Sequence, residues 1–226
     1  MGQTAISIIG LHGVATSDEE VERGFELIRM HVGSRGIRWI LPKARARPLS
    51  ILGGCAALAW YDLKTCDRSQ MDVGGLEEAT ETVCNIVKAE RNRAPSGQRL
   101  VLMGFSQGGA VALNAGLRLG AEVDGIIALA TALPFLDHIA PATSLSPPVF
   151  IGHGLLDLRI PYSFARETHR VLTANGYATE FRSYLYGHTT GHRQLRHVSQ
   201  WLGQHVLDGR LATTLRPRAL GHVVPA

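Results

Sequence analysis

Cysteine is scarce in this chain of 226 residues, which has three cysteines, Cys55, Cys66 and Cys84. An odd number of cysteines without Cys-x-x-Cys spacing excludes a disulfide scaffold and a zinc ribbon. Disulfides persist mainly in oxidising compartments, so their absence favours a reducing one. We therefore expect free thiols and a cytoplasmic protein.

Long hydrophobic runs are also missing. The first apolar run, residues 5–11, is too short for a signal peptide, and the residues before it include no basic side chain. No stretch approaches the roughly 20 apolar residues of a membrane span. The sequence therefore predicts neither a signal peptide nor stable membrane insertion.

Charge is modest, at 19% of the residues, and the formal net charge of +4 is unevenly placed. Arg210, Arg216 and Arg218 all lie in the last 17 positions, which leaves the rest of the chain close to neutral. A second basic cluster, at 43–47, contains no aromatic residue of the kind that stacks on nucleic-acid bases. We therefore expect no nucleic-acid partner.

What is present is an alternation of short apolar runs with longer amphipathic segments, the pattern of a mostly parallel sheet whose strands are joined by helices. Strands are predicted at 5–11, 37–41, 99–105, 124–130, 149–153 and 179–186. Helices are predicted at about 18–33, 75–93, 107–119, 161–174 and 195–206, the first with a capping box formed by Ser17 and Glu20. Periodicity stops at Gly209. We therefore expect one α/β domain over 1–208 and a basic, flexible tail over 209–226.

A Gly-x-Ser-x-Gly pentapeptide, Gly104-Phe105-Ser106-Gln107-Gly108, joins a predicted strand to a predicted helix. Such a pentapeptide by itself also occurs as a simple glycine-rich turn. Between a strand and a helix, however, the two glycines allow a sharp turn that exposes the serine hydroxyl at the end of the sheet. Ser106 is therefore the predicted nucleophile.

A nucleophilic serine needs a histidine as base and an acid that orients the histidine. Asp157 follows the predicted strand 149–153, and His188 follows the strand 179–186. This order along the chain, with each group on a loop after a strand, is that of hydrolases with a nucleophile turn. We predict Asp157 as the acid and His188 as the base.

Both assignments have alternatives. Asp157 is also well placed to cap the helix that opens near Pro161. His192, four residues after His188, is a competing base. This pair has the spacing of a zinc-binding helix, but Thr189 stands where a zinc protease has its glutamate, so we expect no metal site and no cofactor.

The oxyanion formed during acyl transfer needs backbone N–H donors. The amide of Gln107, directly after the serine, is one candidate. The second is the amide of Val14, in the loop after the first strand, where Gly13 permits a close approach of the backbone. The neighbouring His12 is expected to be structural and to bond a carbonyl group of its loop.

At this point the chain resembles the acyl-protein thioesterase, lysophospholipase and carboxylesterase family of serine hydrolases. The resemblance spans about positions 5–207, in the family's order. Its blocks are Leu11-His12-Gly13; Trp60-Tyr61-Asp62; Gly104-Phe105-Ser106-Gln107-Gly108-Gly109-Ala110; His153-Gly154 with Asp157, Ile160 and Pro161; and Tyr184 to His188 ahead of Trp201-Leu202. It implies an α/β-hydrolase fold, with a mostly parallel central sheet flanked by helices on both faces.

The resemblance also implies an activity, the hydrolysis of carboxylic ester or thioester bonds of acyl substrates through an acyl-enzyme. Ser106, Asp157 and His188 would form the triad, and the family's oxyanion positions fall on Val14 and Gln107. The expected substrate is a small acyl ester or thioester, a lysophospholipid or an acylated protein. The residues expected to make the acyl groove apolar are Leu49, Ile51, Leu52, Leu58, Trp60 and Leu155.

A departure from the family pattern leaves alternatives open. After Gly13 the chain runs directly toward a helix instead of through a small polar turn, so the oxyanion loop is expected to differ in shape. Two rival functions remain. One is a non-catalytic binding protein on a hydrolase scaffold, and the other is a peptidase or acyltransferase with the same triad. An apolar face near Trp60 would serve a homodimer contact as well as a substrate.

Overall fold

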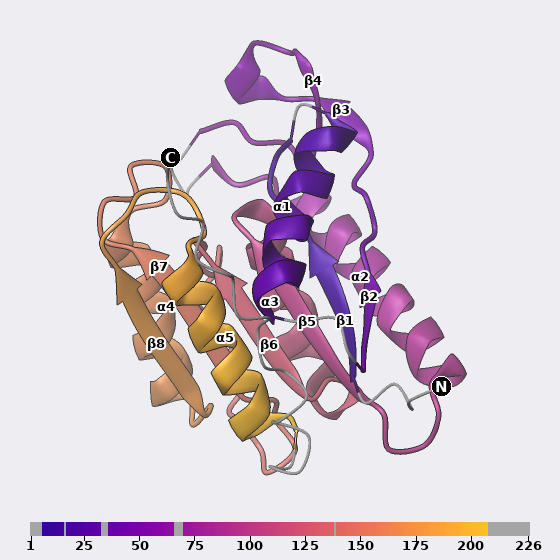
Figure 1. Cartoon of the computed structure of the whole chain (residues 1–226). Helices are drawn as coiled ribbons and strands as arrows, with labels where there is room; N and C mark the ends of the chain where they lie inside the picture. The colour runs from indigo at the N-terminus through magenta and orange to yellow at the C-terminus, as the bar shows by residue number, and fades with distance from the viewer. Residues whose placement is uncertain (1–5, 16, 33–35, 66–69, 138, 208–226) are drawn as a thin grey trace, which may run out of the picture.

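A six-stranded parallel sheet forms the centre of the protein, in the order β2-β1-β5-β6-β7-β8 (Figure 1). The computed structural model describes residues 6–15, 17–32, 36–65, 70–137 and 139–207. Its sheet strands are β1 (Ile6–Leu11), β2 (Ile37–Ile40), β5 (Arg99–Phe105), β6 (Gly125–Leu129), β7 (Val149–Gly154) and β8 (Thr179–Tyr184). Because all strand pairs are parallel, the carboxyl ends of the strands meet at one edge of the sheet.

Helices cover both faces of this sheet. They are α1 (Asp18–Val32), α2 (Val73–Arg93), α3 (Gln107–Leu119), α4 (Tyr162–Ala174) and α5 (His192–His205), with a short 3-10 turn η3 (Gly120–Glu122) after α3. Apolar side chains of α2, α3 and α4 share one core cluster, whereas those of α1 and α5 share another. Figure 1 shows α1 and α5 together in front of the sheet. The predicted α/β-hydrolase arrangement, with helices on both faces, is confirmed.

The predicted strands and helices are all present, and their bounds differ from the predictions by a few residues at most. Ser17 Oγ accepts a hydrogen bond from the Glu20 amide at 3.3 Å, as expected of a helix cap. The helix predicted to start at Pro161 starts at Tyr162, with the proline as its N-cap residue. Hydrophobic periodicity therefore located the main elements well.

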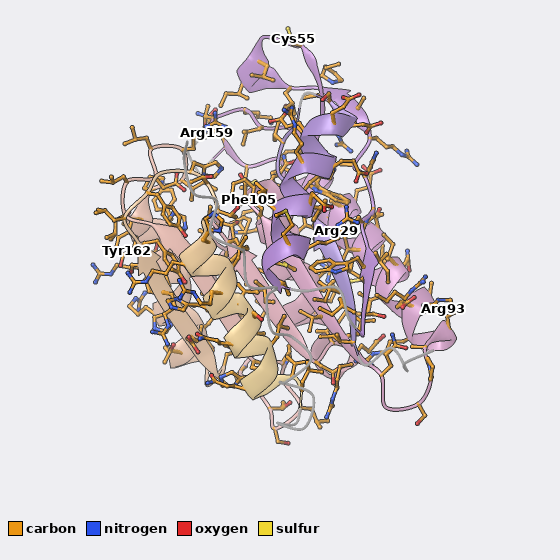
Figure 2. The ribbon with its side chains drawn as sticks, viewed as in Figure 1. Arg29, Cys55, Arg93, Phe105, Arg159 and Tyr162 are labelled. Carbon is orange, nitrogen blue, oxygen red and sulfur yellow. The ribbon has the colours of Figure 1, made fainter. Side chains whose placement is uncertain are left out.

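A small two-stranded lobe was not predicted. It consists of the antiparallel strands β3 (Ala46–Pro48) and β4 (Ala56–Leu58), joined by the 3-10 turn η1 (Ser50–Leu52). Figure 2 shows Cys55 at the tip of this lobe, away from the central sheet. Each strand has three residues, too few to show alternation, and this is why the sequence does not reveal them.

The sequence also predicted free cysteine thiols, a flexible C-terminal tail and no membrane-spanning helix. Cys55 and Cys84 are free thiols, while Cys66 and the segment 209–226 lie outside the described residues. None of the helices in the described ranges is both long and apolar enough to cross a membrane.

Candidate active site

Ser106 lies in the sharp turn between β5 and α3, with φ 53° and ψ −122°. A positive φ is unfavourable for a residue with a Cβ and costs on the order of 1–3 kcal/mol. The turn closes only because its flanks are glycines. A Cβ on Gly104 would overlap the carbonyl oxygen of Gly108, and a Cβ on Gly108 would overlap the carbonyl oxygens of Leu11 and His12. The tight packing therefore holds the serine at the carboxyl edge of the sheet.

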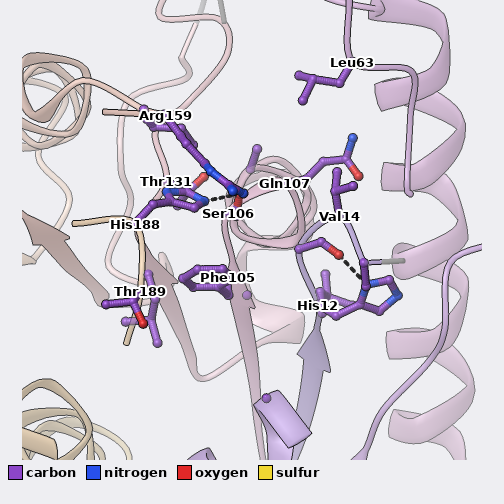
Figure 3. Close-up of a pocket in the computed structure, with 18 of the residues that line it drawn as sticks. His12, Val14, Leu63, Phe105, Ser106, Gln107, Thr131, Arg159, His188 and Thr189 are labelled. Atoms are coloured by element: carbon purple, nitrogen blue, oxygen red, sulfur yellow. Dashed lines mark hydrogen bonds between the residues drawn. The ribbon is translucent and has the colours of Figure 1, made fainter. Parts of the chain in front are cut away.

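His188 lies between Ser106 and Asp157 and contacts both. Its Nε2 is 2.8 Å from Ser106 Oγ (Figure 3), and its Nδ1 is 2.8 Å from Asp157 Oδ2. An ionised carboxylate only accepts hydrogen bonds, so we assign the ring proton to Nδ1. Nε2 is then free to accept a hydrogen bond from the serine hydroxyl.

The Asp157 side chain is fully buried, and two amides and His188 contact its oxygens. Oδ1 accepts hydrogen bonds from the amides of Arg159 and Ile160, each at 2.9 Å, and Oδ2 faces His188. The N-cap residue of α4 is Pro161, so the alternative role of Asp157 as a cap of that helix does not match the structure. Its oxygens are instead directed to its own loop and to the histidine.

His153, at the end of β7, also approaches Asp157, a contact that the sequence did not suggest. Its buried ring places Nε2 2.9 Å from the carbonyl oxygen of Ile160 and 3.4 Å from Asp157 Oδ2. Burial lowers the pKa of His153 below its usual 6.5, although the Ile160 carbonyl and the carboxylate act in the opposite direction. A neutral imidazole here packs beside the Asp157 carboxylate without neutralising its negative charge.

The competing histidine, His192, is the first residue of α5 and is not among the residues that line the cavity around Ser106. His188 belongs to the preceding loop. The two histidines therefore do not share a helix, as the zinc-binding arrangement would require.

On the other side of Ser106, His12 bonds the main chain with both ring nitrogens. The Ala44 amide donates to its Nε2 at 3.0 Å, so Nδ1 carries the proton and donates to the Gly13 carbonyl oxygen at 2.5 Å (Figure 3). Burial lowers the pKa of His12. The expectation that His12 bonds a carbonyl group of its own loop is confirmed.

The side chain of Gln107 connects α3 to the segment after β4. Its Oε1 accepts a hydrogen bond from the Trp60 amide and its Nε2 donates to the Tyr61 carbonyl oxygen, both at 2.8 Å. Trp60 Nε1 in turn donates to the His12 carbonyl oxygen at 2.9 Å. This network ties the loop after β1 to the start of α3.

The loop that contains Val14 lies directly against the serine. A Cβ on Gly13 would come within 3.1 Å of Ser106 Cβ, and Ala15 exchanges two backbone hydrogen bonds with Leu58, at 3.1 and 2.8 Å. The loop after β1 thus forms an isolated antiparallel bridge to β4. Val14 and Gln107 both line the cavity beside Ser106.

A cavity of about 1010 Å³ opens at Ser106 and His188. Three of the six predicted acyl-groove residues, Leu49, Ile51 and Leu52, line it. Further apolar lining comes from α1, from α4 and from the loop after β7; these residues include Phe25, Ile28, Phe164, Leu156 and Leu158. The space beside the serine is therefore mainly apolar.

The other three predicted groove residues lie elsewhere, and the prediction is corrected for them. Leu58 packs against the core beneath α1 and α5. Trp60 is buried against His12, so it also forms no exposed face for a dimer contact. Leu155 is 45% exposed and does not line the cavity, whereas Leu156 does. In each case tertiary packing sets the direction of the side chain, and the spacing of residues along the chain does not predict it.

Comparison with known proteins identifies the family of this chain. Residues 3–206 match the phospholipase/carboxylesterase family. The chain is 30% identical over 192 residues to acyl-protein thioesterase 1 of Mycosarcoma maydis, covering 77% of this chain and 80% of that one. It is 24% identical over 223 residues to carboxylesterase SOBER1 of Arabidopsis thaliana, covering 94% and 96%.

Solved structures show the same fold. The structure of Zea mays acyl-protein thioesterase 2 superposes with a TM-score of 0.78 at 24% identity, covering 90% of this chain and 95% of that one. The structure of Arabidopsis thaliana SOBER1 gives a TM-score of 0.77 at 21% identity, covering 88% and 98%. At this identity the likeness concerns the fold.

Proposed function

The chain belongs to the phospholipase/carboxylesterase family and is a hydrolase of ester or thioester bonds, and from this premise we propose that it works through a covalent acyl-enzyme on Ser106. The observation that carries the proposal is the position of His188, whose two ring nitrogens lie 2.8 Å from Ser106 Oγ and 2.8 Å from Asp157 Oδ2. This is the geometry that a histidine needs to take a proton from a serine while a carboxylate orients it.

In the first half of the reaction, Ser106 Oγ attacks the acyl carbonyl carbon and its proton passes to His188 Nε2. The backbone amides of Val14 and Gln107 hold the negative charge that develops on the carbonyl oxygen. His188 then gives the proton to the departing alcohol or thiol, and the acyl group stays on the serine. Asp157 stabilises the imidazolium without taking its proton.

In the second half, water attacks the acyl-enzyme. His188 takes a proton from the water and returns it to Ser106 Oγ as the carboxylic acid leaves. The reaction uses a proton relay and a backbone oxyanion site. We therefore expect that a chelator does not lower the rate of hydrolysis.

The cavity supports an acyl substrate of considerable size. At about 1010 Å³ it lies at the upper end of the roughly 300–1,000 Å³ typical of ligand pockets. The acyl chain would lie against Leu49, Ile51 and Leu52. Acylated proteins and lysophospholipids are the proposed natural substrates, the former in agreement with the names of the thioesterase relatives.

The test is hydrolysis of p-nitrophenyl esters from acetate to palmitate and of matched thioesters. We expect wild type to hydrolyse both classes, and Ser106→Ala to lose about 10⁶-fold in turnover. Ser163→Ala removes an exposed hydroxyl on α4 outside the cavity and is the matched control.

A fluorophosphonate probe gives an independent readout, because it labels only an activated serine. Labelling of wild type and Ser163→Ala, but not of Ser106→Ala, is the expected result. Folded Ser106→Ala with near-normal turnover would overturn the proposal.

A further inference from the structure

Arg159 brings a positive charge into the cavity that the proposed mechanism does not use. It lies in the loop between β7 and α4 and lines the cavity together with Ser106 and His188. Figure 2 places it at the carboxyl edge of the sheet, and Figure 3 shows its side chain extending toward Ser106. Among the described residues that line the cavity, one other has a carboxylate, guanidinium or ammonium group: Glu20, which belongs to α1.

The backbone of Arg159 is fixed relative to the proposed triad. Its amide donates to Asp157 Oδ1 at 2.9 Å, and the next amide, of Ile160, donates to the same oxygen at 2.9 Å. The Ile160 carbonyl oxygen is 2.9 Å from His153 Nε2. The base of the arginine side chain is therefore held at a constant place beside the serine.

Among the residues that the structure describes, no carboxylate oxygen lies within 4.0 Å of the guanidinium group of Arg159. By contrast, Arg118 pairs with Glu77 at 2.6 Å. The nearby carboxylate, Asp157, is already occupied by two amides and His188.

We propose that Arg159 binds a carboxylate or phosphate group that the substrate carries close to its scissile bond, so that the enzyme selects anionic acyl substrates. The planar guanidinium presents two parallel N–H donors that match either oxyanion. This inference rests on the proposed role of Ser106, because the serine defines where the scissile bond lies. The apolar lining around the rest of the cavity disfavours an anion elsewhere, so the remainder of the substrate is apolar.

Two substrate pairs locate the charge on the acyl or the leaving-group side. In the first pair, p-nitrophenyl hemiadipate is compared with p-nitrophenyl adipamate, which has a neutral carboxamide in place of the carboxylate. In the second pair, the hexanoyl ester of 4-hydroxybenzoate is compared with that of 4-hydroxybenzamide. Each rate is divided by the rate of hydroxide-catalysed hydrolysis, which removes differences in intrinsic reactivity.

The measured quantity is the ratio of kcat/KM for the anionic ester to that for its neutral partner. It is independent of the fraction of active protein. We expect wild type to favour the anion by about 10-fold or more in at least one pair, the scale of a hydrogen-bonded charge pair. In that pair Arg159→Gln brings the ratio to about 1, mainly through KM. Arg159→Lys gives an intermediate ratio, because a lysine keeps the charge but not the two parallel donors.

Arg170→Gln is the matched control. It removes the same charge from an exposed position of α4 outside the cavity, and we expect it to keep the wild-type ratio. Higher salt should also reduce the wild-type preference, since it screens an accessible charge.

The inference is overturned if wild type shows no preference for the anion in either pair, or if Arg159→Gln and Arg159→Lys both keep the wild-type ratio. Failure of the proposed function looks different. In that case Ser106→Ala hydrolyses the neutral esters as fast as wild type, or wild type hydrolyses none of the four esters, and the role of Arg159 is rejected with it.

Discussion

The two sides of Ser106 are built from different kinds of interaction. On the β1 side, His12, Trp60 and Gln107 bond backbone amides and carbonyls, and both ring nitrogens of His12 are occupied by the main chain. On the β7 and β8 side, Asp157 and His188 face each other and the serine through side-chain atoms. The β1 side fixes the conformation of the backbone beside the serine. The β7 and β8 side contains the groups that can exchange or stabilise a proton. Substitutions on the two sides should therefore have different consequences.

The largest effect is expected on the β7 side, from Asp157→Asn. The amide keeps the size of the side chain, but it removes the charge that orients His188 and stabilises its protonated form. We expect a loss of about 10⁴-fold in kcat, with little change in KM, as in other serine triads. Steady-state kinetics on a p-nitrophenyl ester measure it.

The matched control is Asp137→Asn, which alters an exposed aspartate outside the cavity. It should have wild-type kinetics. A loss smaller than about 10-fold in folded Asp157→Asn would mean that the carboxylate does not orient His188.

On the β1 side, Gln107→Glu should have a smaller effect, a loss of about 10- to 100-fold in kcat. The carboxylate can still accept from the Trp60 amide, but it cannot donate to the Tyr61 carbonyl oxygen, and it places a buried charge near the developing oxyanion. Gln200→Glu, on the exposed part of α5, makes the same change as a control. Equal kinetics of the two variants would show that the Gln107 side chain does not shape the site.

Trp60→Phe tests the β1 side through stability. The phenyl ring fills most of the space of the indole, but the buried His12 carbonyl oxygen loses its donor. We expect the free energy of unfolding to fall by about 1–2 kcal/mol, measured by urea denaturation.

Trp39→Phe is an informative comparison for that measurement, because the buried Trp39 Nε1 has no hydrogen-bond partner among the described residues. The same substitution therefore breaks no hydrogen bond there. A loss at position 39 as large as that at position 60 would show that ring size, and not the hydrogen bond, accounts for the effect.

The smallest effect is a dependence of stability on pH. Burial lowers the pKa of His12 and His153 below the usual 6.5, so the unfolded chain binds protons there before the folded protein does. The free energy of unfolding should therefore have its highest value above about pH 6.5. It should decrease as the pH falls below 6.5 and passes through the lowered pKa values of the two folded-state histidines. Urea denaturation at pH 7.5, 6.5 and 5.5 measures this slope.

His12→Gln should make the slope shallower, because glutamine has an acceptor and a donor but no proton to gain. The exposed His205 provides the control substitution, His205→Gln, which should keep the wild-type slope. Equal slopes in the two variants would contradict a neutral buried His12.

The predictable part of the fold depended on local signals. The strand at 99–105 and the glycines around Ser106 predict the turn, because a Cβ on Gly104 would overlap Gly108 within the turn itself; the overlap at Gly108 involves Leu11 and His12, which the turn sequence does not reveal. The order of Asp157 and His188 after their strands predicted residues that the structure brings together, since parallel strands end at one edge.

Less of the site's surroundings could be predicted. Leu58, Trp60 and Leu155 had the expected chemistry and sequence position but face other parts of the protein. His153 belonged to one of the blocks of the family resemblance, but nothing in the sequence indicated its contact with Asp157. Arg159 gave no signal of its own, because an arginine in a loop is common. The proximity of both residues to Asp157 results from a loop that folds back over β7.

By itself, the sequence determined the alternation of strands and helices, the strained turn at Ser106 and the order of the groups that follow it. These properties depend on periodicity and on the backbone freedom of glycine, which act within a few residues. Only the tertiary structure decided which apolar side chains line the cavity, that the His12, Trp60 and Gln107 network fixes the loop after β1, and that Arg159 extends toward the serine. Those outcomes depend on packing and hydrogen bonds between residues far apart in the chain, 48 positions apart in the case of His12 and Trp60, which no local pattern encodes.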